Sequence, residues 1–177
     1  MAKEISITKP TVCIVEGGAE RAILDTLLSH GKLIFSKEDL MEGEILPRCS
    51  AREFQTNYLN KEFDEPITVI RVIDSRRENF SLGKGFQEKI RLITVITAPE
   101  IEVLIIIAEG AYKHFLKEKM KPSDYCKDAL RIKDVKSKDF VKEYFRDVDK
   151  LIYALREYKR LKKIKKNEYT LLDLIKE

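Results

Sequence analysis

Short apolar runs rich in β-branched residues alternate with helical patterns along the first two thirds of this chain. The clearest strand signal is ITVIRVI at residues 67–73, which begins directly after Pro66. TVCIV at 11–15, LITVI at 92–96 and a weaker run at 32–35 predict further strands. Since strands separated by helices favour a parallel sheet with right-handed crossovers, we predict an α/β fold. Its doubly wound, mainly parallel sheet should have about four strands flanked by helices.

Helical periodicity predicts helices over 19–29 and, with Ser50 as N-cap, over 51–60. The sequence TAPE at 97–100 has the form of a helix start and predicts a helix from Glu100 to about Lys117. Beyond Lys121 the pattern is wholly helical, with segments at 122–130, 137–145, 148–164 and 169–175. We therefore expect an α/β domain at 1–118 and a basic helical appendage at 119–177. The appendage either forms a subdomain or covers one face of the sheet.

The composition favours a soluble, cytoplasmic protein without a membrane partner. The 177-residue chain is 44% hydrophobic, enough for a core of its own. Its longest apolar run, at 101–108, contains Glu102 and is far shorter than the roughly 18 residues of a membrane span. The first ten residues lack the apolar stretch of a signal peptide. Three cysteines without CxxC spacing argue against a disulfide framework and against a zinc site.

Positive charge is concentrated in the C-terminal third of the chain. Residues 1–110 contain 14 Lys and Arg against 18 Asp and Glu, whereas residues 111–177 contain 20 against 12. The maximum is KRLKKIKK at 159–166. Such a stretch is either a solvated helix face or a surface for a polyanion, because cations that neutralise phosphates supply sequence-independent affinity. On the second interpretation, nucleic acid is bound by Lys159, Arg160, Lys162, Lys163, Lys165 and Lys166.

Acidic residues end or follow the predicted strands. Glu16 ends the first strand, Asp74 follows the 67–73 strand, and Glu100 and Glu102 open the helix after the last strand. The carboxyl ends of parallel strands lie at one edge of the sheet, so these acids are expected to converge there. Each acid also has a structural interpretation, as a turn residue, a loop cap or a first-turn acid. Carboxylate oxygens are the ligands that Mg²⁺ prefers, and the pattern therefore predicts a site for Mg²⁺ or Mn²⁺.

Three segments carry a resemblance to a known family. VCIVEGGAERAIL at 12–24 resembles the first motif of the TOPRIM (topoisomerase–primase) fold, in the branch shared by OLD-type nucleases and RloB-like proteins. There an apolar strand ends in a V-E-G turn and a second Glu opens the next helix. VIRVID at 69–74 is similar to the second motif, and PEIEVL at 99–104 is similar to the start of a later helix in RloB-like members.

The resemblance covers about residues 11–108 and implies a TOPRIM-like sheet. It implies that Glu16 is the acid–base glutamate and that Asp74 is the first acid of a D-x-D metal motif. The chain departs from this motif at Arg76, where the second acid would stand. Either Glu78 or Glu102 then substitutes as a ligand, or the metal site is degraded.

These considerations define the candidate site. The catalytic candidates are Glu16, Asp74 and Glu102, and the candidate metal ligands are Glu16, Asp74, Glu78 and Glu102. Phosphate is expected to bind the glycine turn before the first helix, whose N–H groups point outward, and cationic side chains of the loop after the 67–73 strand. These phosphate-binding candidates are Gly17, Gly18, Arg76, Arg77 and Lys84.

Phosphodiester cleavage requires charge neutralisation at the scissile phosphate and an activated water, and Mg²⁺ ions held by carboxylates supply both. We therefore expect a metal-dependent nuclease acting on DNA or RNA. The resemblance further implies a role in defence against foreign nucleic acid, often beside an ATPase partner. The chain has no P-loop pattern, so any ATP hydrolysis must come from elsewhere.

Two other functions stay open at this stage. The first is a catalytically inactive, TOPRIM-derived nucleic-acid-binding or regulatory subunit, which Arg76 favours. The second is a protein-interaction subunit whose basic helix meets an acidic partner. Assembly into a homo-oligomer is also left open.

Overall fold

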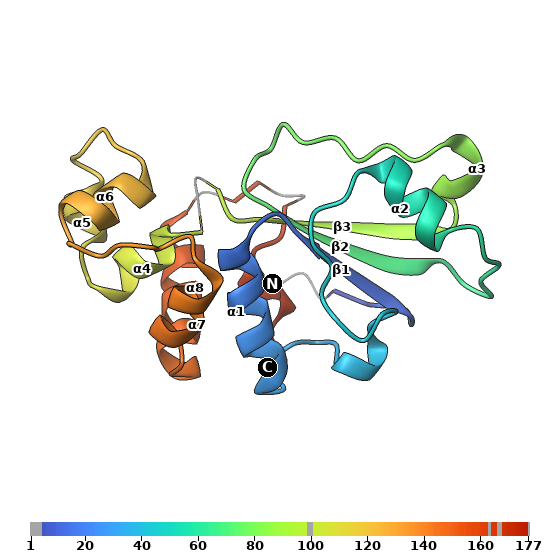
Figure 1. The fold of residues 1–177 in the computed structure, drawn as a ribbon, viewed down its shortest axis with the longest axis horizontal. Coiled ribbons are helices and arrows are strands. Elements are labelled where there is room, and N and C mark those ends of the chain that lie inside the picture. Colours follow the sequence, from blue (N-terminus) through green and yellow to red (C-terminus); the bar gives the residue numbers. More distant parts are fainter. Residues whose placement is uncertain (1–4, 99–100, 163, 166–167, 177) are drawn as a thin grey trace.

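The computed structural model describes residues 5–98, 101–162, 164–165 and 168–176. Its strands are β1 (Thr11–Val15), β2 (Ile67–Ile73) and β3 (Ile90–Ile96), which form a parallel sheet in the order β1-β2-β3 (Figure 1). Helices flank this sheet on both faces. The predicted α/β class, with a parallel sheet flanked by helices, is therefore confirmed.

The prediction of about four strands is wrong, because the sheet in the described part of the chain has three. The run at 32–35 lies outside the sheet and pairs with the C-terminal segment instead. Leu33 forms an isolated antiparallel bridge with Ile175, and the Ile34 N–H donates to the carbonyl of Leu174 at 2.8 Å. Leu33 and Phe35 are buried, so the apolar residues of this run anchor the C-terminal segment to the core.

Among the described residues, each segment predicted to be helical contains a helix, in several places with shorter bounds, whereas the helical turns at Lys84–Gln87 and Lys37–Asp39 were not predicted. No helix among these residues is both long enough and apolar enough to cross a membrane. The α-helices are α1 (Gly18–Ser29), α2 (Ala51–Tyr58), α3 (Lys84–Gln87), α4 (Val103–Ala108), α5 (Tyr112–Phe115), α6 (Pro122–Asp128), α7 (Lys138–Tyr144) and α8 (Val148–Leu161), and 3₁₀ turns span Lys37–Asp39 (η1) and Leu171–Leu174 (η2).

The predicted helix from Glu100 to about Lys117 is wrong as a single element. The structure divides it into α4 and α5, with Gly110 between them at a φ of 68°. Glycine adopts this left-handed conformation without the steric penalty of a Cβ atom, and a residue in that conformation ends a helix. Glu100 itself lies outside the described residues.

Each face of the sheet has its own core. On one face, Cys13, Ile70 and Val95 pack with α1 and with the helices that follow β3. On the other face, Val12 and Val69 pack with side chains of α2 and the loop after β2. A parallel strand covered on both sides is buried along its whole length, which explains why every residue of β2 is buried.

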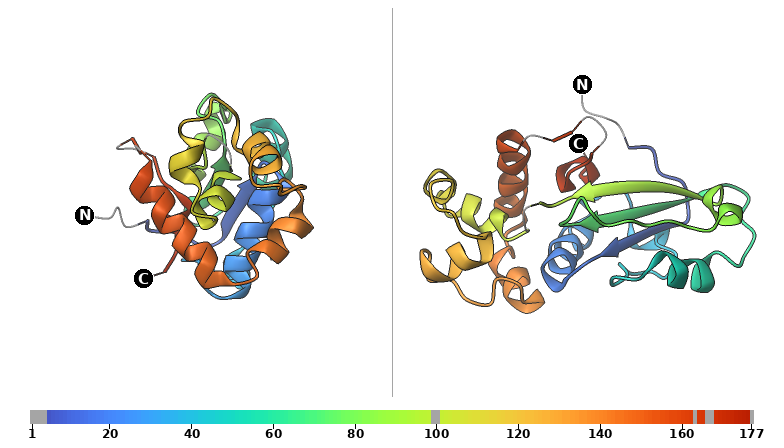
Figure 2. Two further views of the ribbon diagram at one scale, coloured as in Figure 1. Left: turned by 90° about the vertical axis from the view of Figure 1, so that its left-hand side faces the viewer. Right: turned by 90° about the horizontal axis from the view of Figure 1, so that it is seen from above.

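Helices α4 to α8 gather beyond the carboxyl ends of the strands, beside α1 (Figure 2). α7 lies against α1, and α8 lies against α4. Leu151, Leu155 and Tyr158 of α8 belong to the same buried cluster as Cys13 of β1. The helices after residue 119 therefore share a continuous core with one face of the sheet.

Candidate functional site

Glu16 and Asp74 lie side by side at the carboxyl edge of the sheet. β1 and β2 are parallel neighbours with Val15 opposite Val72, so the residues that follow the two strands leave the sheet at the same edge. The backbone N–H of Asp74 donates to Oε2 of Glu16 at 3.0 Å. The structure thus brings together two acids that are 58 residues apart in the chain.

The Glu16 carboxyl group is electrostatically unusual. Burial raises its pKa to about 7, the backbone N–H of Asp74 opposes this shift, and the neighbouring carboxyls of Glu78 and Asp74 add to it. Its Oε1 atom is buried and accepts no hydrogen bond from any described donor. The hydrogen bond between the carboxyls of Glu16 and Glu78 requires a proton on one of them, since two ionised carboxylates cannot bond to each other.

Glu78 connects the acids to two arginines. Its Oε2 accepts from Nη2 of Arg71 at 2.9 Å, and its Oε1 accepts from Nη2 of Arg48. Burial acts to raise the pKa of Glu78, but the hydrogen bond with Glu16 and the two guanidinium groups hold it below its ordinary value. Glu78 is therefore an anion that contacts the Glu16 carboxyl on one side and the guanidinium groups of Arg48 and Arg71 on the other.

Glu20 is a fourth acid at this edge, which the sequence analysis left out of the site. It lies in the first turn of α1 and is buried. Burial raises its pKa, the backbone N–H groups of Glu20 and Gly17 oppose the shift, and the charge of Asp74 adds to it. The second Glu of the V-E-G-G-x-E pattern was the signal for this residue.

The glycine turn before α1 is already covered by the protein. A Cβ atom on Gly17 would lie 2.8 Å from Oε2 of Glu20, and one on Gly18 would lie 3.4 Å from the carbonyl of Lys136. The carboxylate of Glu20 and the loop before α7 therefore face Gly17 and Gly18, where the sequence predicted a phosphate.

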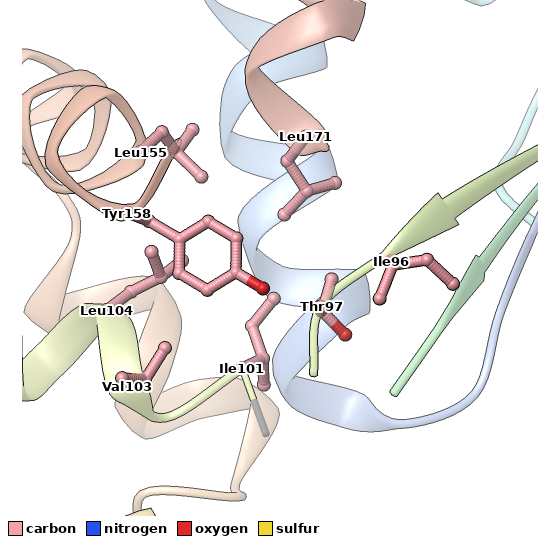
Figure 3. A pocket seen from close by; sticks show the side chains of 8 residues that line it. All are labelled: Ile96, Thr97, Ile101, Val103, Leu104, Leu155, Tyr158 and Leu171. Carbon is pink, nitrogen blue, oxygen red and sulfur yellow. The ribbon is translucent and has the colours of Figure 1, made fainter. Parts of the chain in front are cut away.

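Glu102, the third catalytic candidate, is the N-cap residue of α4 and is buried. Its carbonyl accepts from Sγ of Cys126 in α6 at 4.0 Å. Its neighbours Ile101, Val103 and Leu104 line a small apolar cavity of about 10 Å³ with Tyr158 (Figure 3). A space of this size holds about one water molecule, so it is no substrate site.

The acids at the carboxyl edge are incomplete as a metal site in the arrangement they have. Within the described ranges, no three His, Cys, Asp or Glu side chains are arranged to hold one ion as they lie. The carboxyl of Asp74 interacts with that of Glu16, whose buried Oε1 accepts no hydrogen bond from the described residues, and carboxylate oxygens suit a hard cation. The third acid, Glu78, points its oxygens at Arg48 and Arg71 and would have to leave them to become a ligand.

The predicted phosphate-binding cations, Arg76, Arg77 and Lys84, do not form one cluster in the structure. Arg76 forms a bidentate pair with Glu168 of the C-terminal segment, at 2.5 and 2.9 Å. Lys84 begins α3, which directly precedes β3 and lies at the opposite end of the sheet from α1 (Figure 1). Arg77 is exposed and directly precedes Glu78, which together with Glu16 and Asp74 we call the acid cluster.

Arg77 lines a polar pocket of about 630 Å³ between α2 and the loop after β2. We call it the arginine pocket, because it is lined by three arginines together with Cys49, Ser50 and Glu78, among others. Sequence analysis missed its other two arginines, Arg48 and Arg71. The sequence did contain an indication for Arg71, because a lone arginine inside an apolar strand is a buried charge that requires partners.

Three cationic side chains of the basic tail, those of Lys159, Arg160 and Lys162, contact partners within the chain. Lys159 binds Asp173 at 2.6 Å, and Arg160 binds Glu157 at 2.7 Å. Lys162 lies 5.6 Å from the ring centre of Tyr112, and burial lowers its pKa. The backbone N–H of Lys165 donates to Glu168 at 3.2 Å, and Lys163 and Lys166 lie outside the described residues.

Comparison of the chain with protein-family models, with curated proteins and with solved structures found no match. The TOPRIM resemblance therefore stays a prediction that rests on the motifs quoted above.

Proposed function

We propose that this protein is a Mg²⁺- or Mn²⁺-dependent nuclease that cleaves phosphodiester bonds in DNA or RNA. The observation that carries the proposal is the contact between Glu16 and Asp74 at the carboxyl edge of the sheet, next to Glu78 and the arginine pocket. Converging acids beside cationic side chains suit phosphoryl chemistry, because the acids hold a cation and move protons while the cations orient the phosphate.

Glu16 is the residue best suited to proton transfer. A general acid or base is most effective when its pKa is near the working pH, and the pKa of Glu16 is about 7. Its Oε2 atom is held by the Asp74 N–H, which leaves Oε1 to exchange a proton. Asp74 and Glu16 would hold the cation, with Glu78 as the third ligand. The cation would supply charge neutralisation at the scissile phosphate.

The first prediction concerns the acids themselves. Glu16→Gln and Asp74→Asn should each reduce cleavage of labelled single- and double-stranded DNA and RNA in Mn²⁺ or Mg²⁺ by at least about 100-fold, the usual contribution of general acid–base catalysis. The matched control is Glu62→Gln, because the Glu62 side chain is 96% exposed and pairs with Lys89 at the other end of the sheet. Cleavage by the Glu16→Gln, Asp74→Asn double variant at the wild-type rate would reject this site.

The second candidate function is a nucleic-acid-binding subunit without metal chemistry. It is favoured by Arg76, which stands where the family motif has its second acid and is paired with Glu168. Binding that weakens with salt and does not respond to divalent cations, in a protein that cleaves none of the substrates, would select this alternative. A role in defence and an ATPase partner follow from the resemblance alone.

A further inference from the structure

We propose that the arginine pocket binds a phosphate group of a nucleotide or of a nucleic-acid strand. The proposed function supplies the kind of ligand, and the structure supplies the pocket. Its volume of about 630 Å³ is in the range of small-molecule sites. It is also separate from the glycine turn and from Arg76, the positions at which the sequence predicted phosphate.

Arg71 is the fixed cation of the pocket. It projects from β2, is 5% exposed, and stacks its guanidinium 4.5 Å from the ring centre of Phe80. Glu78 accepts from Nη2, but Nε is buried and has no partner among the described residues. A buried guanidinium with an unsatisfied donor is costly, and a phosphate offers several acceptor oxygens to such a group.

Arg48 and Arg77 are the accessible cations. The side chain of Arg48 is 64% exposed, and Arg77 is exposed as well. Two acids also line the pocket, but Glu53 accepts from the backbone N–H of Ser50 at 2.7 Å and so caps its own helix. The three guanidinium groups exceed the two carboxylates by one positive charge, which matches an anionic ligand.

The position of the pocket makes it useful to the proposed reaction. Glu78 lines the pocket and also contacts Glu16. A phosphate bound by Arg48, Arg71 and Arg77 therefore lies beside the acid cluster, where it would hold a strand in register with Glu16 and Asp74. Positioning of this kind is a large part of phosphoryl-transfer catalysis.

The pocket contains its own reporter group. Cys49 lines it and is partly exposed, whereas Cys13 and Cys126, the other two cysteines of the chain, are 0% exposed. Alkylation of the native protein therefore reports on Cys49. A ligand in the pocket should slow this reaction.

The test measures alkylation of Cys49 by iodoacetamide in EDTA, so that no cleavage occurs. The added ligands are inorganic phosphate and an octathymidylate with or without a 5′-phosphate. Alkylation should slow, and Arg77→Gln should raise the ligand concentration for half-protection by about tenfold or more, as expected for one lost charge-assisted contact. Arg48→Gln should act in the same direction. The control is Arg91→Gln, which removes the same charge from an exposed position on β3 outside the pocket.

The ligands also identify the source of the phosphate. Protection by inorganic phosphate and by the 5′-phosphorylated oligomer alone assigns a terminal phosphate, whereas equal protection by both oligomers assigns an internal phosphodiester. Lack of protection by all three ligands would overturn the proposal, as would half-protection that changes equally in Arg77→Gln and Arg91→Gln. The protection assay contains no cation, so its result does not depend on cleavage. If Arg77→Gln weakens protection, but the wild-type protein cleaves none of the substrates in Mg²⁺ or Mn²⁺, the nuclease function is rejected and the phosphate site is retained.

Discussion

At the scale of single residues, Glu16 combines partial burial with a close acidic neighbour on each side. Asp74 contacts it through the backbone and Glu78 through the side chain. Two of these acids end or follow strands, and that is why the sequence pattern could find them. Arg48 could not be found in this way, because it reaches Glu78 from the segment before α2 and neither ends nor follows a strand.

The raised pKa of Glu16 predicts a pH dependence of stability. The folded-state pKa of about 7 lies above the ordinary value of 4.5, so the carboxyl contributes stability below pH 4.5 that is lost as the pH rises through 7. Glu16→Gln keeps an acceptor for the Asp74 N–H and carries no charge. It should therefore raise the free energy of unfolding at pH 8 by about 1 kcal/mol, after discounting for solvent screening, and leave it nearly unchanged at pH 4.

Urea denaturation at pH 4 and pH 8 measures this difference. Glu62→Gln is again the control, since an exposed carboxyl should show no such contrast between the two pH values. A Glu16→Gln variant that is less stable than the wild type at pH 8 would show that the folded protein stabilises the ionised Glu16 carboxylate, which contradicts a raised pKa.

At the scale of elements, the sequence predicted the bounds of those segments whose ends are marked by a particular residue, such as a proline, an acid or a helix cap. β2 was predicted with the bounds it has, because Pro66 precedes a β-branched run that stops at Asp74. α2 begins after Ser50, as predicted, and Ser50 and Glu53 form a capping box. The residues at 32–35 were misassigned because a short apolar run has the same composition whether it pairs in a sheet or packs in a core.

The break between α4 and α5 gives a prediction at this scale. Gly110 has a φ of 68°, a conformation that costs an L-residue about 1 kcal/mol. Gly110→Ala should therefore lower the free energy of unfolding by about that amount, although no atom lies within 4 Å of the added Cβ. Thermal or urea denaturation measures the change.

Gly85 provides the matched comparison. It lies within α3, and a Cβ there would also meet no atom within 4 Å. Its backbone is not in the left-handed region, so Gly85→Ala should be neutral or stabilising by a few tenths of a kcal/mol. Equal losses in the two variants would contradict a conformational origin for the break at Gly110.

At the scale of the whole molecule, the C-terminal helices and the sheet share one core. The sequence divided the chain at residue 118 on charge and on the loss of strand signals, and neither feature reports whether two segments pack together. The structure places Leu151 of α8, which is 0% exposed, in one cluster with Cys13 of β1. The Arg76–Glu168 pair also ties the loop after β2 to the C-terminal segment.

This packing predicts a single cooperative unfolding transition. Cys13 in β1 and Cys126 in α6 are both fully buried, so single-cysteine variants that retain one or the other report separately on the sheet and on the helices. Both thiols should become reactive at the same urea concentration. Leu151→Ala should lower the free energy of unfolding by about 3 kcal/mol, as is usual for a buried leucine, and so move both urea midpoints down by the same concentration. Exposure of Cys126 before Cys13 would instead show that residues 119–177 unfold on their own.

The shared use of Glu78 has a consequence for how ligands would affect one another. A divalent cation that recruits Glu78 releases Arg48 and Arg71, and a phosphate that recruits these arginines releases Glu78. The cation thereby removes the carboxylate that competes with phosphate for the arginines, and phosphate removes the arginines that compete with the cation for Glu78. Thermodynamic reciprocity then requires that phosphate raise the affinity for the cation by the same factor as the cation raises the affinity for phosphate. The Arg48–Glu78 and Arg71–Glu78 ion pairs of the ligand-free protein would in this way make the cation and the nucleic-acid strand each increase the affinity for the other.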